Sequence, residues 1–461
     1  MNLTSPSSVS VQAGPMSDLI TAVFESWKRS GIDFLVLRNH ETLPHFTTND
    51  IDVLVAPAQR DRAEQTLIAA AADAGWRLHN RAEFATLSLH LCRTDTNGQA
   101  HFDLFTDLRW RSFEFLRCRD FLRQKIARGL FAVPHPAHEA CTNLLASLIF
   151  SGRVKDKYKP AIAAAFRADR DAASDLLAET YGRRLADSLV ETALQEHWAA
   201  IEANVGRLRR KLVVRQAVLS PGRSLKSLAS DLVRLSRRWL RPPGLTLVLL
   251  GADGSGKSTV ARLISDGLTN TFSPQKSRHF HWKPRIFFSG RAQAHPTTDP
   301  HGRPPRNRVL ALCYFGYHWL EFFLGAPLKI RPVLFKGGLA LIERYFCDFF
   351  VDQTRYRLNV PPALVRLGYQ LVKKPDLVIL LDATPEVLRA RKQEVSLPET
   401  IRQRDAYRKF VAGLGNGVMV DASQPPDKVA ADAIRAVLEF MVERTRHRTP
   451  SWRGRNGPVA F

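Results

Sequence analysis

The chain has 461 residues, 45% of them hydrophobic, and its net charge is +23 at neutral pH. This length exceeds the size at which one core keeps growing, so we expect two or more domains. The charge indicates an anionic partner, such as a nucleotide, a nucleic acid, a polyanionic polymer or an acidic membrane surface. The five cysteines form no CxxC pair, which disfavours a disulfide scaffold and fits a cytoplasmic location.

The N-terminal part of the chain is expected to form a tail followed by an α+β domain. Residues 1–16 are serine-rich and lack the basic and apolar regions of a signal peptide, so we expect a disordered tail. Residues 17–125 alternate between strand-like and helical patterns. The strand-like runs lie at 34–37, 51–55 and 101–105, and the clearest helical pattern lies at 61–74.

Three aspartates in this domain form a candidate metal site. Asp50 and Asp52 share one face of a strand because they are two residues apart, and Asp103 enters from a neighbouring strand. Such a carboxylate cage binds paired Mg²⁺ ions that activate a hydroxyl and stabilise departing pyrophosphate. The D-x-D pattern with a distant third aspartate resembles the nucleotidyltransferase superfamily, although Arg38-Asn39 replaces its Gly-Ser element. The alternative is that Asp50 and Asp52 belong to an ordinary turn.

Residues 126–205 are expected to be a helical segment, and a basic connector follows at 206–243. The connector carries apolar residues at helical spacing with basic residues on its other faces. The apolar stripe comprises Leu225, Leu228, Leu232, Leu235 and Trp239, and the basic residues are Arg223, Lys226, Arg234, Arg237, Arg238 and Arg241. A helix over 223–241 would either lie on an anionic membrane surface or pack its stripe on a neighbouring domain, and we favour the second interpretation.

The most informative segment is a glycine-rich loop after the apolar run 245–250. Its glycines let successive N–H groups point at anionic oxygens, and the helix that follows presents its positive end. Lys257 would reach the β- and γ-phosphates of ATP, and Ser258 would ligate Mg²⁺. The expected nucleotide-binding residues are Gly251, Asp253, Gly254, Ser255, Gly256, Lys257, Ser258 and Thr259.

Further charged residues follow in the order that phosphoryl transfer requires. A buried strand at 338–346 carries Glu343, which can hold Mg²⁺ through water, and then Arg344, which can grip an acceptor phosphate. After another strand at 376–382 comes a candidate lid with catalytic cations. The lid cations are Arg389, Arg391, Lys392, Arg402 and Arg404. The apolar run 309–324 is too short to span a membrane, so we expect a buried or interfacial helix.

These motifs make residues 244–443 resemble the thymidylate kinase family of P-loop kinases. The resemblance rests on G-A-D-G-S-G-K-S-T at 251–259, E-R-Y at 343–345, L-D-A-T-P-E…R at 381–391 and D-A-S-Q at 421–424. It implies an α/β fold with a parallel sheet and helices on both faces, as in nucleoside monophosphate kinases. It also implies that Lys257 and the lid arginines handle ATP, that Arg344 binds the acceptor phosphate, and that Asp253 faces the acceptor.

Two departures from the family pattern concern the substrate. Glu343 stands where the family has aspartate, and F-H-W-K-P at 280–284 replaces the R-E-P-G-G element that shapes the acceptor site.

An unusual loop follows at 290–308, and His279, His281 and His295 near it lack metal-ligand spacing, so we do not expect a metal there. A basic tail, 444–461, is expected to be disordered.

We therefore expect a cytoplasmic enzyme that transfers the γ-phosphoryl of Mg·ATP to a nucleoside monophosphate or a related phosphorylated or sugar acceptor. One alternative is a nucleotidyltransferase that uses the aspartate triad on a sugar phosphate or macromolecule, as in surface-polysaccharide assembly. Another is a non-catalytic ATP-binding scaffold at the membrane. No interleaved basic and aromatic motif supports nucleic-acid binding. The acceptor and the oligomeric state, a homodimer included, stay open.

Overall fold

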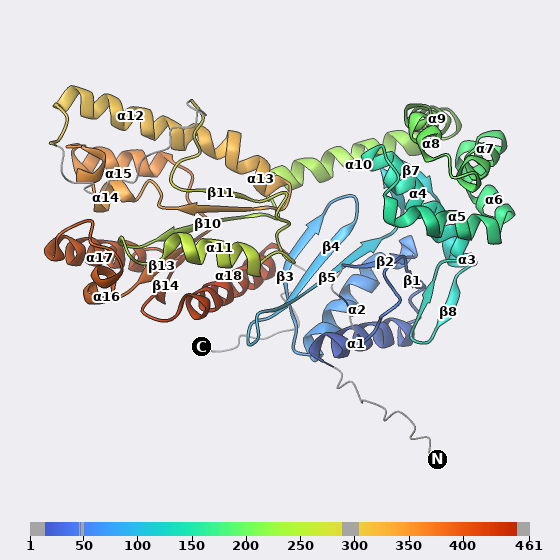
Figure 1. Cartoon of the computed structure of the whole chain (residues 1–461), viewed down its shortest axis with the longest axis horizontal. Coiled ribbons are helices and arrows are strands. Elements are labelled where there is room, and N and C mark those ends of the chain that lie inside the picture. Colours follow the sequence, from blue (N-terminus) through green and yellow to red (C-terminus); the bar gives the residue numbers. More distant parts are fainter. Residues whose placement is uncertain (1–13, 46, 48–49, 288–303, 450–461) are drawn as a thin grey trace, which may run out of the picture. The chain divides into compact units, whose positions relative to one another are not determined.

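The computed structural model describes residues 14–45, 47, 50–287 and 304–449 (Figure 1). His295, most of the loop 290–308 and the outer parts of both predicted tails lie outside the described residues. The chain divides into two compact units. The N-terminal unit comprises Met1–Arg93 and Ala100–Ser236, and the C-terminal unit comprises Thr94–Gln99 and Arg237–Phe461.

A five-stranded mixed sheet forms the first part of the N-terminal unit. Its elements are α1 (Pro15–Arg29), β1 (Phe34–Val36), β2 (Ile51–Val55), η1 (Pro57–Gln59), α2 (Arg60–Asp73), β3 (Arg77–Glu83), β4 (Leu87–Arg93) and β5 (Gly98–Phe105). The strand order is β1-β2-β5-β4-β3. Strands β2 and β5 are parallel, and their register sets Asp52 opposite Asp103. The predicted strand pairing of the aspartates is therefore present.

Two short hairpins lead into a helical part. They are built from β6 (Leu108–Trp110), β7 (Phe113–Leu116), α3 (Cys118–Arg123), β8 (Ile126–Arg128) and β9 (Phe131–Val133). The helices that follow are α4 (Pro136–Ser151), η2 (Asp156–Tyr158), α5 (Lys159–Ala168), α6 (Arg170–Tyr181), α7 (Arg183–Leu194), α8 (Trp198–Ala203), α9 (Val205–Leu219) and α10 (Pro221–Leu240). Leu144, Leu177, Leu189 and Leu208 share one core that joins four of these helices. The helical segment thus begins at Pro136, and β8 and β9 precede it.

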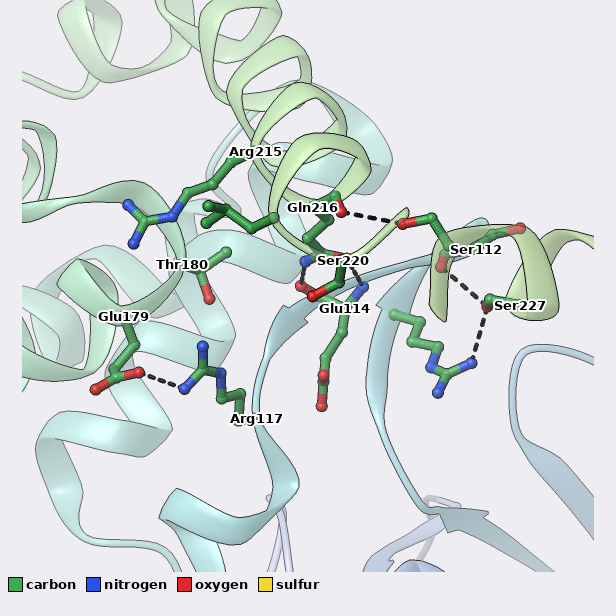
Figure 2. A pocket seen from close by; sticks show the side chains of 12 residues that line it. Ser112, Glu114, Arg117, Glu179, Thr180, Arg215, Gln216, Ser220 and Ser227 are labelled. Atoms are coloured by element: carbon green, nitrogen blue, oxygen red, sulfur yellow. Dashed lines mark hydrogen bonds and ion pairs between the residues drawn. The ribbon is translucent and has the colours of Figure 1, made fainter. Parts of the chain in front are cut away.

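The corner between α9 and α10 is held to the hairpin β6–β7 by polar contacts (Figure 2). Gln216 accepts a hydrogen bond from the backbone N–H of Glu114 at 3.1 Å and donates one to the same residue's carbonyl. Ser227 of α10 donates to the carbonyl of Ser112 at 3.0 Å. The contacts border a cavity of about 110 Å³. This cavity has room for only a few water molecules.

Helix α10 turns a polar face toward its own unit and its apolar stripe toward solvent. Asp231, on the packed face, accepts a hydrogen bond from Ser112 at 2.6 Å. Leu225, Leu228 and Leu232 are 69%, 51% and 58% exposed. The stripe therefore does not pack on its own unit, and its packing on a neighbouring domain stays a prediction. The physical reason is that the hairpin offers hydroxyl and carbonyl groups, which attract the polar face.

The C-terminal unit is a parallel α/β sheet. Its elements are β10 (Leu245–Leu250), α11 (Lys257–Gly267), β11 (Arg278–Phe280), α12 (Arg308–Gly325), η3 (Ala326–Ile330), α13 (Arg331–Phe335), β12 (Leu339–Glu343), α14 (Asp348–Val351), η4 (Thr354–Tyr356), α15 (Pro362–Leu371), β13 (Leu377–Asp382), α16 (Pro385–Arg391), α17 (Leu397–Ala412), β14 (Gly417–Asp421) and α18 (Pro426–Arg448). The order is β11-β12-β10-β13-β14, and every pair is parallel.

Helices cover both faces of this sheet (Figure 1), with α11 and α18 on one face and α12 and α15 on the other. The predicted architecture is confirmed for this unit. Ligands of such sheets bind at the carboxyl ends of the strands, and the phosphate loop follows the carboxyl end of the central strand β10. Helix α18 continues to Arg448, so the first residues of the predicted basic tail are helical.

Helix α12 is longer than the sequence suggested. It passes through the π-helical turn η3 into α13, and each of these short elements carries a proline, Pro327 or Pro332, in its first turn. Among the described residues, Arg308–Phe335 is the one segment long and apolar enough to cross a membrane. The indication is weak because His318 and Glu321 are buried on the face that packs into the core. The expectation that this segment is too short to span a membrane is therefore wrong about its length. The expectation of a buried or interfacial helix is unchanged.

Candidate functional site

The loop after β10 has the conformation that a phosphate-binding loop requires. Gly251 and Gly254 have φ angles of +152° and +85°, which side chains with a Cβ rarely adopt. A Cβ on Gly254 would lie 2.4 Å from the carbonyl oxygen of Leu388. Gly256, with φ of +81°, caps the N-terminus of α11. The loop amides and the positive end of the helix dipole therefore act together on an anion.

A pocket of about 670 Å³ opens over this loop. All of the predicted nucleotide-binding residues except Gly251 and Ser255 line it; those that do are Asp253, Gly254, Gly256, Lys257, Ser258 and Thr259. Gly251 and Ser255 are buried residues of the loop itself, and Ser255 is almost inaccessible. The volume suits the phosphates of a nucleotide together with a second small group.

The Lys257 side chain folds back into the loop. Its Nζ atom donates to the carbonyl oxygens of Gly251 and Ala252, each at 2.9 Å. Burial, together with repulsion from Arg344, lowers the pKa of Lys257 to about 8. A buried ammonium with a lowered pKa favours an incoming polyanion, because the new negative charge restores the protonated form.

Ser258 and Glu343 stand side by side at the edge of the pocket. The Ser258 hydroxyl donates to Glu343 Oε2 at 2.6 Å, and Glu343 is 5% exposed at the carboxyl end of β12. Burial acts to raise the pKa of Glu343, but hydrogen bonds from His279 and Ser258 lower it, so the carboxylate stays ionised. A hydroxyl beside an ionised carboxylate is an oxygen donor set that fits Mg²⁺.

A network of ion pairs joins the loop to the segment after β12. Arg344 and Arg355 both pair with Asp253, and Arg344 also lies 3.3 Å from Asp348. Burial acts to raise the pKa of Asp253, yet these arginines hold it far below its ordinary value. Arg344 has φ of +65°, a left-handed conformation that costs an arginine about 1–3 kcal/mol. Arg344 lines the pocket.

The predicted lid cations separate into two groups. Arg391 lines the pocket with Lys392 and donates to the carbonyl of Ala422 at 2.8 Å. Arg389 belongs to the same helix, α16, but is not among the pocket residues. Arg404 instead forms a bidentate pair with Asp382, at 2.7 and 2.9 Å. Arg402 pairs with Glu399 of its own helix.

An aromatic wall lies where the family pattern has its acceptor element. Trp282 stacks on Tyr356 with ring centroids 4.5 Å apart. The Tyr356 hydroxyl donates to Asp348 at 3.0 Å, and Asp348 is the partner of Arg344. The departure F-H-W-K-P therefore connects an indole to Arg344 through Tyr356 and Asp348.

The aspartates of the N-terminal unit do not form a simple cage. Asp52 is buried and pairs with Arg38, whereas Asp50 and Asp103 lie 2.9 and 3.2 Å from the two ring nitrogens of His101. Burial acts to lower the pKa of His101, but its hydrogen bonds to both aspartates raise it to about 9. An imidazolium thus lies between two of the predicted metal ligands, and Arg38 neutralises the third.

Sequence reasoning missed several pocket residues. Arg355 and Glu394 line the pocket, and the pair of Arg355 with Asp253 joins η4 to the phosphate loop, about a hundred positions earlier in the chain. His279 and His281 were set aside for lack of ligand spacing, yet both lie close to Glu343. The signal that could have found them is their spacing of two at the end of β11, the strand that pairs with the strand of Glu343.

Comparisons with known proteins agree with the motifs. No family model matches the sequence. The thymidylate kinase of Xanthomonas campestris pv. campestris is 27% identical over 221 residues, which cover 45% of this chain and 88% of the relative. The probable thymidylate kinase of Pyrobaculum aerophilum is 29% identical over 206 residues, which cover 41% and 96%.

Among solved structures, the thymidylate kinase from Ehrlichia chaffeensis matches 42% of this chain and 100% of that chain, with a TM-score of 0.30 and 14% identity. The parallel sheet with helices on both faces fits an α/β P-loop fold. Over about 45% of its length, the chain is homologous to thymidylate kinases.

Proposed function

We propose that residues 244–443 form an ATP-dependent kinase of the nucleoside monophosphate type. The observation that carries this proposal is the convergence of cations on one pocket. Lys257, Arg344, Arg355, Arg391 and Lys392 line it together. Its acidic lining residues are Asp253, Glu343 and Glu394. Such an excess of positive charge suits two phosphorylated ligands held end to end.

The two sides of the pocket divide the work. The loop amides and Lys257 hold the β- and γ-phosphates of ATP. Arg344 and Arg355 give up their ion pairs with Asp253 and bind the acceptor phosphate instead. An oxygen of the acceptor forms a bond to the γ-phosphorus as the bond from that phosphorus to the β–γ bridging oxygen breaks, and ADP departs. Arg391 and Lys392 stabilise the charge that shifts between these oxygens. Mg²⁺, held by Ser258 and Glu343, would neutralise the phosphates and orient the γ-phosphoryl group.

The acceptor we propose is a small monophosphate. Thymidylate kinases give the class of acceptor, but the indole of Trp282 replaces the element that shapes their acceptor site. Trp282 and Tyr356 would border a planar or ring-shaped group of the acceptor, because Tyr356 contacts Asp348, the partner of Arg344. Nucleoside monophosphates and sugar phosphates both satisfy this description.

The test is transfer of γ-labelled phosphate from ATP to a panel of monophosphates, thymidylate and sugar phosphates included. We expect a labelled product with at least one acceptor and none with the Lys257→Ala variant. An unlabelled panel, or equal labelling by the variant, would refute the proposal.

A second activity, nucleotidyl transfer, would belong to residues 17–125. The parallel register of Asp52 and Asp103 favours it. The pairing of Asp52 with Arg38 disfavours it, because the carboxylate must leave the guanidinium to meet a metal. Transfer of an α-labelled nucleotide that survives Lys257→Ala and is lost with Asp50→Ala would support this activity.

A further inference from the structure

Two histidines and a carboxylate meet beside the phosphate loop. His279 lies in β11, and His281 is two residues further along, so both side chains point to the same side of the strand. Strand β11 pairs in parallel with β12 as far as Phe280 and Ile342, and the next residues of the two segments are His281 and Glu343. The pairing of two strands therefore creates a cluster that residue spacing alone does not reveal.

The donor atoms have the separations of ligands around one ion. His279 Nε2 lies 2.8 Å from Glu343 Oε1, and His281 Nδ1 lies 3.4 Å from the same oxygen. All three donors fall within 4.8 Å of one another. Bonds of about 2.0–2.2 Å from one metal place neighbouring ligand atoms about 3.0 Å apart in octahedral and about 3.4 Å apart in tetrahedral geometry. The observed separations suit a shared ion.

The chemistry of the donors separates this cluster from a pure magnesium site. Mg²⁺ prefers oxygen ligands, whereas imidazole nitrogen suits zinc and its neighbours in the first transition row. Three protein ligands also leave coordination positions open, as in catalytic sites rather than structural ones. His281 lines the pocket over the phosphate loop, so these positions face the ligand space.

We propose that His279, His281 and Oε1 of Glu343 bind a divalent transition-metal ion, whereas Oε2 of Glu343 faces Ser258 of the phosphate loop. The ion is of the class for which Zn²⁺ and Co²⁺ are suitable probes. Its open positions would take water in the free protein and a phosphate oxygen of ATP in the complex. Only this last point rests on the proposed kinase function.

The experiment is calorimetric titration of the nucleotide-free full chain with Zn²⁺ in excess Mg²⁺, together with the visible absorption of Co²⁺-loaded protein. We expect a site that survives excess Mg²⁺ and gives Co²⁺ bands typical of nitrogen ligands. Replacing both histidines by alanine should weaken metal binding at this site by about 100-fold or more, because even residues outside the ligand shell are worth about 10–100-fold.

Two further variants distinguish loss of the metal site from loss of the fold. His281 is largely exposed, so His281→Ala alone should fold normally and still weaken binding. Glu343→Gln keeps the side-chain volume and removes the charge. His447→Ala is the matched control, since His447 is an exposed histidine that pairs with a glutamate, Glu443, at 2.9 Å. We expect it to bind the probe like the wild type.

Three results would overturn the proposal. One is Zn²⁺ binding that the double histidine variant leaves unchanged. Another is binding lost only with His101→Ala, which would place the ion at the cluster of Asp50, His101 and Asp103. The third is complete displacement of Zn²⁺ by excess Mg²⁺. Lys257→Met, which should abolish ATP binding, should keep the metal, so failure of the kinase proposal and failure of the metal proposal can be told apart.

Discussion

Binding of ATP should be linked to protonation of Lys257. Its ammonium is buried against the carbonyl oxygens of Gly251 and Ala252, and its pKa is about 8 in the free protein instead of 10.5. The triphosphate favours the charged form, so the pKa of Lys257 rises when ATP binds. Above pH 8, the free protein must therefore take up a proton in order to bind.

The expected size of this effect follows from the lowered pKa. About nine tenths of the lysine is charged at pH 7 and about one tenth at pH 9, so the affinity for ATP should fall about tenfold, or about 1.4 kcal/mol. The loss should continue at about tenfold per pH unit until the pKa that Lys257 has in the ATP complex is approached. Acidification below pH 7 should change this contribution little, because the lysine is already protonated.

Calorimetry in two buffers of different ionisation enthalpy measures both the affinity and the number of protons taken up. Lys257→Arg is the matched control, since a guanidinium stays charged throughout this range. The affinity of this variant should not depend on pH between 7 and 9. A wild-type affinity that is equally flat, with no proton uptake at pH 9, would refute the argument.

Three other outcomes follow from the geometry. Arg344→Ala should lower kcat/KM for the acceptor by about 10²–10³-fold while ATP still binds; coupled detection of ADP measures this, and an unchanged value would contradict the role of the arginine. Gly254→Ala should lower the free energy of unfolding by about 1–3 kcal/mol, because the new Cβ meets the carbonyl of Leu388; denaturation by urea checks it, and an unshifted midpoint counts against it. Asp103→Asn should move the pKa of His101 from about 9 toward 6.5. The raised pKa stabilises the fold fully below about pH 6.5 and is lost as the pH rises through about 9, so imidazole NMR and unfolding at both ends of this range test it, and an unmoved titration would disprove the contact.

Local patterns were enough to predict the phosphate loop and the strands around it. The residues of this region are close together in the sequence, from the apolar run at 245–250 through the loop glycines to Lys257. Their phosphate-binding chemistry could therefore be predicted from the sequence alone. The charged residues Glu343 and Asp382 could also be predicted from the sequence, because each ends an apolar run that is typical of a buried strand. The rule that parallel strands present their carboxyl ends to one edge then brought these residues together.

The remaining features depend on pairings that no local pattern encodes. His279 and Glu343 meet because β11 pairs with β12, and Arg355 reaches Asp253 from η4, a segment that carries no motif. The exposed stripe of α10 reflects the polar hairpin beneath the helix and not the helix itself. Asp52 lies opposite Asp103, as expected, but its carboxylate forms an ion pair with Arg38.

The central claim is that the C-terminal unit, and not the aspartates of the N-terminal unit, transfers phosphate. Its most direct test is the single-turnover rate of γ-phosphoryl transfer to the best acceptor in the wild type, Lys257→Met and Asp50→Asn. We predict that the first substitution abolishes transfer and that the second leaves the rate unchanged. Transfer that survives Lys257→Met, or that disappears with Asp50→Asn, would contradict the claim.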